Sequence, residues 1–282
     1  MKKNKDESVF DRLKKNKAAM AGMIVLSVFV LTALCADFIS PYSEGIRQNS
    51  SERLRWPSAA HPFGTDNFGR DVFTRIIHGA RFSIALGLST ITLAMTIALI
   101  LGSAAGYFGG RLDEIIMRIM DIIMCIPSIL LSLAIVTVLG PGLFNLMIAI
   151  AVGSVPSFTR LIRSVVLTIT ESDYIEAAKA AGSGHAKIIF THIIRNALGP
   201  LIVYATTSIA GMILMAAGFS FIGLGVRPPA PEWGAMLSDA RENLRRAPYL
   251  MVFPGVSILL TALSFNLLGD GLRDALDPRL KV

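Results

Sequence analysis

The longest uncharged stretch of this chain lies between Asp121 and Arg160 and contains 38 residues. As a single helix it would extend about 57 Å at ~1.5 Å per residue, nearly twice the roughly 30 Å thickness of the apolar core of a bilayer. The stretch therefore has to fold back on itself. Gly140-Pro141-Gly142 lies near its middle and combines the two residue types that most readily end a helix. The sequence predicts two membrane-spanning helices joined by a hinge at these residues.

Four further uncharged runs are each long enough for one helical crossing of a membrane, at residues 18–36, 82–108, 196–226 and 247–269. The composition agrees, since 53% of the residues are apolar and 17% are charged. A cleaved signal peptide is the alternative for residues 18–36, but this run exceeds the usual core of roughly 7–15 residues and no clean small-residue cleavage site follows it. We expect an all-α polytopic membrane protein with six transmembrane helices, the first of which is a retained anchor.

The polar stretches between these runs define the remaining organisation. Prolines at positions 41, 57 and 62 exclude a long helix over most of residues 40–81. The end of this segment predicts a helix at the membrane surface, because five apolar residues share one helical face: Val72, Phe73, Ile76, Ile77 and Ala80. The expected divisions are a basic tail (1–17), an anchor (18–39), an extracytoplasmic segment with the interfacial helix (40–81), a five-helix core (82–272) and a second tail (273–282).

The distribution of lysines indicates the orientation. All nine lysines lie before the first span, in the loop at residues 171–192 or at the end of the chain. Basic residues in short loops concentrate on the cytoplasmic side, and six crossings place both termini on one side. We therefore expect both termini and the 171–192 loop in the cytoplasm. The net charge of +7 is thus attributed to membrane topology. Nucleic-acid binding is not indicated, because the sequence contains no basic stripe interleaved with aromatic residues.

Residues 171–192 form a polar loop between the expected fourth and fifth spans. Thr170 with Asp173 fits an N-terminal helix cap, and Gly182 can end the helix with a positive φ. Small side chains dominate the helix between them: Ala177, Ala178, Ala180 and Ala181. One interpretation is a docking helix whose backbone another protein surface approaches closely. The other is an alanine-rich helix that merely joins two spans, and helix propensity alone favours this second interpretation.

The sequence lacks motifs of catalysis and of metal binding. No Gly-x-x-x-x-Gly-Lys-Ser/Thr loop occurs, so this chain is not an ATPase, and no His-Glu-x-x-His or Gly-x-Ser-x-Gly indicates a hydrolase. The four histidines share no metal-ligand spacing and are interpreted as surface polar residues: His61, His78, His185 and His192. Only His61 and His78 would merit testing if the cargo were a metal complex. Cys35 and Cys125 are interpreted as small apolar residues. We expect no catalytic, cofactor-binding or metal-binding residue.

Charged residues near the third span offer one further candidate. Glu114, Arg118 and Asp121 can pair on one helical face near the membrane edge, which is favoured over a functional carboxylate at Asp121. Beyond their ends, the expected spans carry essentially no charge. Ion-coupled carriers need ionisable groups at mid-membrane. Energy for uphill transport would therefore come from a partner docked on the polar loop.

Several motifs together resemble one family. Glu176-Ala-Ala, then Gly182 and an isoleucine-rich segment, resembles the cytoplasmic loop of ABC importer membrane subunits. Similar stretches elsewhere are Gly106-Tyr-Phe-Gly-Gly110, Ser220-Phe-Ile-Gly-Leu-Gly225, Pro231-Glu-Trp-Gly234 and residues 266–278. From about residue 18 onward, the chain is similar to the dipeptide, oligopeptide and nickel permeases, inner-membrane components of binding-protein-dependent transport systems. It departs from them at Arg195, where members usually carry proline.

This resemblance implies an ABC importer permease fold with a coupling helix in the cytoplasmic loop 171–192. ATPase coupling would then involve Glu176, Ala177, Ala178, Ala181 and Gly182. The implied partners are a second homologous permease subunit, two cytoplasmic ABC ATPases that bind ATP and magnesium, and an extracytoplasmic solute-binding protein. The implied location is the prokaryotic plasma membrane.

The expected function is ATP-driven import of di- or oligopeptides or similar small solutes. A nickel or metallophore importer is the alternative, because that subfamily shares these motifs. A proton-coupled carrier or a membrane enzyme is a remote alternative. The sequence leaves open the cargo, the pore-lining residues, the identity of the two ATPases and the effect of Arg195. Bulky replacement of Ala178 or Gly182 is expected to uncouple transport.

Overall fold

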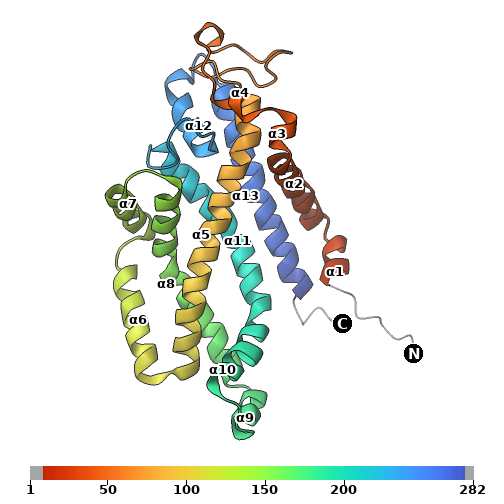
Figure 1. The fold of residues 1–282 in the computed structure, drawn as a ribbon. Helices are drawn as coiled ribbons and strands as arrows, with labels where there is room; N and C mark the ends of the chain where they lie inside the picture. Colours follow the sequence, from red (N-terminus) through yellow and green to blue (C-terminus); the bar gives the residue numbers. More distant parts are fainter. Residues whose placement is uncertain (1–8, 277–282) are drawn as a thin grey trace, which may run out of the picture.

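Long helices dominate the computed structural model, which describes residues 9–276 (Figure 1). Five helical segments are long and apolar enough to cross a membrane. They contain α2 (Lys17–Leu34), α5 (Val72–Phe108), α8 (Leu143–Thr170), α11 (Ile194–Phe221) and α13 (Tyr249–Leu276). Shorter helices are α1 (Val9–Lys15), α3 (Ala36–Ile39), α4 (Tyr42–Ile46), α9 (Asp173–Ala180), α10 (His185–Lys187) and α12 (Trp233–Ala240). Single turns are Ser50–Glu52, Ile188–Ile193 and Arg241–Asn243. No β-strand occurs within residues 9–276, which confirms the all-α class.

The remaining crossing is a bent pair of helices. α6 (Gly110–Met124) and α7 (Ser128–Leu139) meet at 82°, and counted as one span they bring the total to six, as the sequence predicts. α7 ends before Gly140 and α8 begins after Gly142, so the expected hinge is confirmed. The sequence does not predict the bend within this third span. Pro127 lacks an N–H and disfavours a helical conformation in the residue before it, so the chain bends there.

α5 is one continuous helix over 37 residues. At ~1.5 Å per residue it is about 55 Å long, so it extends well beyond a 30 Å apolar core. The expectation of a separate surface helix before residue 82 is therefore wrong. Its first three turns instead support a polar cap, which we define as residues 40–71 and 227–247, at one end of the bundle (Figure 1).

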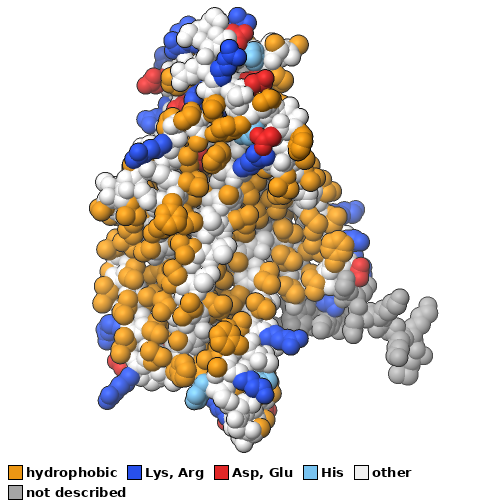
Figure 2. All heavy atoms as spheres, in the orientation of Figure 1, with side chains coloured by type: hydrophobic (Ala, Val, Ile, Leu, Met, Phe, Trp, Pro, Cys, Tyr) orange, Lys and Arg blue, Asp and Glu red, His pale blue; other side chains and the backbone are white. Residues whose placement is uncertain are grey.

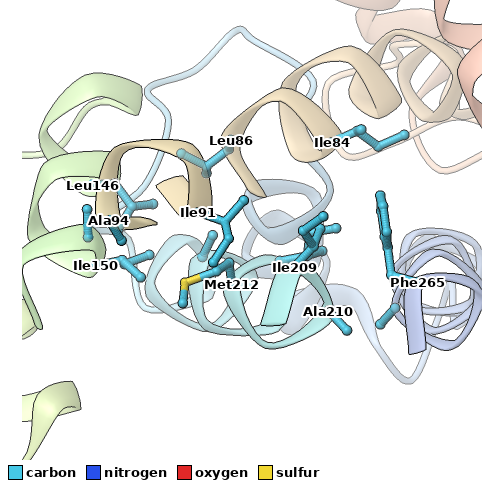
Figure 3. Packing of buried hydrophobic residues seen from close by; sticks show 14 of the residues in the cluster. Ile84, Leu86, Ile91, Ala94, Leu146, Ile150, Ile209, Ala210, Met212 and Phe265 are labelled. Atoms are coloured by element: carbon cyan, nitrogen blue, oxygen red, sulfur yellow. The ribbon is translucent and has the colours of Figure 1, made fainter. Parts of the chain in front are cut away.

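The most extensive helix contact joins α5 to α8, and two glycines permit it. A Cβ atom added at Gly102 would lie 2.8 Å from the Thr159 carbonyl oxygen, and one added at Gly106 would lie 2.9 Å from Val166 Cβ. Small residues four apart let membrane helices approach closely, where dispersion rather than the hydrophobic effect drives association. Figure 3 shows the same contact nearer the start of α5, where Ala94 lies close to Ile150.

Buried ion pairs hold the polar cap together. Arg70 Nε donates to Asp66 Oδ2 at 2.6 Å and Arg70 Nη2 to Asp239 Oδ2 at 3.0 Å. Arg75 Nη1 donates to the carbonyl oxygens of Gly45 and Pro229 at 3.0 and 3.1 Å. Both arginine side chains are buried. Guanidinium groups with this many partners join segments far apart in the sequence to the start of α5.

Trp233 and Glu232 connect the cap to α5. Trp233 is fully buried and its Nε1 donates to the Ile76 carbonyl oxygen at 3.0 Å. Glu232 caps α12 by accepting from the N–H groups of Gly234 and Ala235 at 2.9 and 2.8 Å, and it accepts from Ser83 Oγ at 3.3 Å. Burial raises the pKa of Glu232, although these hydrogen bonds oppose the shift.

The two described chain ends lie on the opposite side from the polar cap. α1 and the end of α13 pack together at the end of the bundle toward which α9 also projects (Figure 1). We call this the α9 end. Residues 1–8 of the expected first tail and residues 277–282 of the second lie outside the described residues.

Replacing Gly106 by alanine should destabilise the protein. The added Cβ would lie 2.9 Å from Val166 Cβ and 3.0 Å from the Arg163 carbonyl oxygen, so α5 and α8 must separate, at a cost of about 1–3 kcal/mol. Gly211→Ala is the matched control, because a Cβ there meets nothing within 4 Å. We expect a lower Tm in detergent for Gly106→Ala alone. Equal Tm values would show that the contact is not tight.

Glu232 should make stability depend on pH. Its pKa is raised above the ordinary value of 4.5, so the folded protein keeps a proton that the unfolded chain has already lost. The contribution of Glu232 to the free energy of unfolding is therefore greatest below pH 4.5 and is lost as pH rises through the raised pKa. Thermal melts across this range should show the fall in wild type and not in Glu232→Gln. Identical pH profiles would contradict this account.

Candidate functional site

α9 projects from its end of the bundle between α8 and α11 (Figure 1). One side of this short helix faces the protein: Ile175 is fully buried against the core, and Ala178, one turn later, is half-buried. The other side is exposed. Because a single buried isoleucine contributes about 1.5–3 kcal/mol, Ile175 is the main apolar anchor of α9.

The ends of α9 differ in part from those expected. Ser172, rather than Thr170, occupies the N-cap position, and its side chain makes no capping bond. Thr170 is the last residue of α8, and its hydroxyl donates to the Val166 carbonyl oxygen at 2.8 Å. The Thr170 cap is therefore wrong. Gly182 does have a positive φ of 77°, and its N–H donates to the Lys179 carbonyl oxygen at 3.0 Å.

The end of α5 fixes the residues that follow α9. The Tyr107 hydroxyl and His185 Nδ1 form a hydrogen bond of 2.8 Å, and the two rings pack edge to face with centroids 5.6 Å apart. Lys179 Nζ lies 5.6 Å from the centroid of the Tyr107 ring. Tyr107 is itself buried. Sequence reasoning missed this contact, because 78 residues separate the partners.

The chain leaves the loop as a continuous helix. α10 and a π-helical turn at Ile188–Ile193 lead directly into α11, which contains Arg195. The Asn196 side chain donates to the His192 carbonyl oxygen at 2.7 Å and to the Tyr174 hydroxyl at 3.2 Å. Arg195 in place of the usual proline therefore leaves an unbroken path from the loop into the membrane-spanning helix.

The structure places the five expected coupling residues as follows. Glu176, Ala177, Ala181 and Gly182 are exposed, and we call them the α9 face. Ala178 is half-buried and faces the bundle instead. A Cβ at Gly182 would meet nothing within 4 Å. The α9 face is thus a surface of mostly small side chains on a helix that is fixed at its base, with Glu176 as its charged member.

The other candidate residues from the sequence, two histidines and Asp121, form contacts within this chain. His61 Nδ1 lies 2.9 Å from Asp71 Oδ1 in the polar cap. His78 is buried with Nε2 2.9 Å from the Ser40 carbonyl oxygen, so its surface assignment is wrong. Among the described residues, no group of three or more His, Cys, Asp or Glu side chains could hold a metal ion. Asp121 pairs across helices with Arg160, rather than with Arg118 on its own helix.

The surface defines the class of protein. Figure 2 shows hydrophobic side chains over the middle of the bundle, with charged side chains gathered towards its two ends. Because lipid cannot satisfy exposed polar groups, such a belt of helices belongs within a bilayer. The chain is therefore a multi-pass membrane protein with a small-residue helix presented at one end, an architecture typical of a transport permease.

Comparisons with known proteins identify the family. The profile of binding-protein-dependent transport system inner membrane components matches residues 94–282, and that of the N-terminal TM domain of oligopeptide transport permease C matches residues 7–57. The chain belongs to this family of binding-protein-dependent inner membrane components. It is an ABC importer permease and not an enzyme.

Three relatives carry related names. The dipeptide transport system permease protein DppC of Alkalihalophilus pseudofirmus is 51% identical, over 96% of this chain and 89% of that protein. The di/tripeptide transport system permease protein DppC of Pseudomonas aeruginosa is 45% identical, over 94% and 89%. The glutathione transport system permease protein GsiD of Pectobacterium atrosepticum is 42% identical, over 95% and 89%.

A solved structure shares the fold. A chain of the MetNI methionine ABC transporter, solved in inward-facing conformations, aligns with a TM-score of 0.59 and 20% identity. The alignment covers 71% of this chain and 96% of that chain. The likeness supports the permease fold described above.

Removing the anchor of α9 should loosen the helix without unfolding the bundle. Ile175→Ala leaves a cavity at the base of α9, a change that costs about 2–5 kcal/mol at buried sites. Amide hydrogen exchange over residues 173–180 should then accelerate by about tenfold or more. The exposed neighbour Ala177→Ser is the control and should exchange like wild type. Unchanged exchange in Ile175→Ala would mean that another contact holds α9.

Proposed function

We propose that this chain is a permease subunit of an ATP-driven importer of di- or oligopeptides. The names of its relatives support peptide cargo, since they refer to dipeptide, di/tripeptide and glutathione transport. The α9 face is the observation that carries the mechanism, because a partner can approach its small side chains closely. Glu176 adds one charge for pairing at the rim of that contact.

In the mechanism, a cytoplasmic ABC ATPase binds the α9 face. Two such ATPases bind ATP and magnesium, and their closure draws the α9 helix of this chain towards that of a second permease subunit. Ile175 and the Tyr107–His185 hydrogen bond pass this displacement to α8 and α5. The bundle then rocks as a rigid body between its inward-open and outward-open states.

The orientation follows from the same proposal. The α9 end, with both termini, faces the cytoplasm, and the polar cap faces the solute-binding protein that delivers cargo. The nickel alternative has no specific support in the described residues, because His61 and His78 are both engaged by the protein. Specificity for a particular peptide then resides largely in the binding protein.

The direct test is uptake of a labelled dipeptide by the complete complex in proteoliposomes, with ATP supplied on the α9 side. Ala177→Arg places a long charged side chain on the α9 face, so it should abolish co-purification of the ATPases or uncouple ATP hydrolysis from uptake. Ala59→Arg, an exposed alanine in the polar cap, is the matched control and should retain its ATPases. Normal uptake and ATPase co-purification in Ala177→Arg would refute the docking site.

The energy source is tested in the same vesicles. Uptake by wild type should require ATP and continue after the proton gradient is collapsed. Uptake that persists without ATP and stops without the proton gradient would instead support a carrier.

A further inference from the structure

The span formed by α6 and α7 is interrupted along its length. α6 ends at Met124 and α7 begins at Ser128, and the two helices meet at 82°. Residues 125–127 lie outside both helices, and we call residues 124–130 the helix break. Every residue of the helix break is exposed in this chain. An interruption of this kind leaves backbone polar groups without helical partners.

The start of α7 has three backbone N–H groups that no helical bond uses. The first bond of α7 runs from the Leu131 N–H to the Pro127 carbonyl oxygen at 3.0 Å. The N–H groups of Ser128, Ile129 and Leu130 come before it. No side chain caps them, because the N-cap residue is Pro127, whose side chain has no hydrogen-bonding group. Their partners therefore come from the surroundings of this chain.

Contacts with α8 fix the position of the helix break beside the bundle. A Cβ atom added at Gly153 would lie 3.0 Å from the Ser128 carbonyl oxygen, so α7 starts next to Gly153. One turn further along α7, the Ser132 hydroxyl donates to the Ala149 carbonyl oxygen at 2.9 Å. The order of these contacts shows that α7 follows α8 in the opposite direction.

The position of Gly153 in α8 places the helix break within the apolar core. Gly153 lies ten residues after Leu143, where α8 begins, and seven before Arg160, the first charged residue of α8. These separations are about 15 and 10 Å along the helix. Just beyond the start of α8, the Pro141 carbonyl oxygen accepts from Arg227 of the polar cap at 3.1 Å. Charged residues thus bound the uncharged part of α8 on both sides, and the break lies between them.

Hydrocarbon cannot surround the helix break. Lipid tails offer no hydrogen-bonding groups, so irregular backbone at this depth is tolerated only where protein buries it or where it lines a water-filled cavity. A dry protein neighbour would have to place acceptors opposite three consecutive N–H groups. Water molecules supply acceptors without such a match, and the Ser128 hydroxyl adds a further polar group to the same exposed surface.

We infer that the helix break lines a water-filled translocation path, which the second permease subunit completes from the other side. This inference rests on the proposed function. The bend at Pro127 presents neutral hydrogen-bonding groups in the middle of a stretch that has no charge from residue 122 to residue 159. Neutral groups hold a peptide in transit weakly enough for it to leave, as conduction requires.

Thiol labelling of the complete complex in nanodiscs tests the water path. Ser128→Cys, in a Cys35→Ser/Cys125→Ser background, places a thiol of nearly the same size at the helix break. A membrane-impermeant maleimide is applied at rest and during ATP turnover, and labelling is followed by peptide mass spectrometry. Position 128 should be labelled at least about tenfold faster than the control position Ser27→Cys in one of these states, as expected for water against lipid exposure. Protection of position 128 in both states, or equal labelling of the two positions, would overturn the path.

Ser27 is a control of matched depth in an unbroken helix. It is exposed on α2, the least buried of the five long helical segments. It lies ten residues after Lys17 and seven before Leu34, the same separations that Gly153 has from the ends of the uncharged part of α8. The two variants also share one substitution, serine to cysteine.

Dipeptide uptake tests whether the labelled water path is the transport path. Ser128→Cys complexes treated with a bulky maleimide should lose about tenfold or more of ATP-driven uptake relative to the same variant untreated, because the adduct obstructs the path. Treated Ser27→Cys complexes should stay within about twofold of their untreated form. Uptake by fully labelled Ser128→Cys complexes within about twofold of the untreated variant would show that cargo does not pass the helix break.

The two experiments also separate this inference from the proposed function. If wild type imports no dipeptide, the uptake result falls together with the proposed function, while labelling at position 128 still decides whether the helix break faces water. If wild type imports dipeptide with ATP and position 128 is protected, the proposed function stands and the path is overturned.

Discussion

The close contact between α5 and α8 is the interaction on which the rest of the structure depends. Gly102 and Gly106 have no side chains, so the backbones of these two helices meet along their length. This contact brings the end of α5 beside the end of α8, where Tyr107 and Ile175 hold α9. The opposite end of α5 carries Arg75, which donates to the Gly45 carbonyl oxygen of the polar cap. The continuous helix α5 therefore connects the two polar ends of the molecule.

The bilayer limits where charged side chains can lie along α5 and the helices that pack against it. In the polar cap, arginines are buried with several partners each, and Glu232 is buried among backbone donors. Beyond the polar cap, two ion pairs join α6 to α8. Asp113 and Arg163 use both carboxylate oxygens, whereas Asp121 and Arg160 use one contact and stay exposed. The Asp113–Arg163 pair is therefore the tighter link between α6 and α8.

The sequence predicts those features that depend on residues close together in the chain. Uncharged runs and the hinge at Gly140–Gly142 predict six crossings, and alanines around Ala177 predict a small exposed helix face. The bend before Pro127 was not predicted, because the uncharged run of residues 122–159 indicates a fold-back but not the path of each helix within it. Pairs such as Tyr107 with His185 and Asp121 with Arg160 join residues far apart, so only packing reveals them. Thr170 has the chemistry of a cap, but α8 extends through it.

The central claim is that an ATPase in the cytoplasm contacts the exposed side of α9. A photo-crosslinking amino acid at Ala181, introduced into the complete complex in intact cells, tests this contact directly. The account predicts a crosslink from position 181 to the ATPase subunit, identified by mass spectrometry. Crosslinks from this position only to an extracytoplasmic protein, or none to an ATPase in an assembled and active complex, would contradict it.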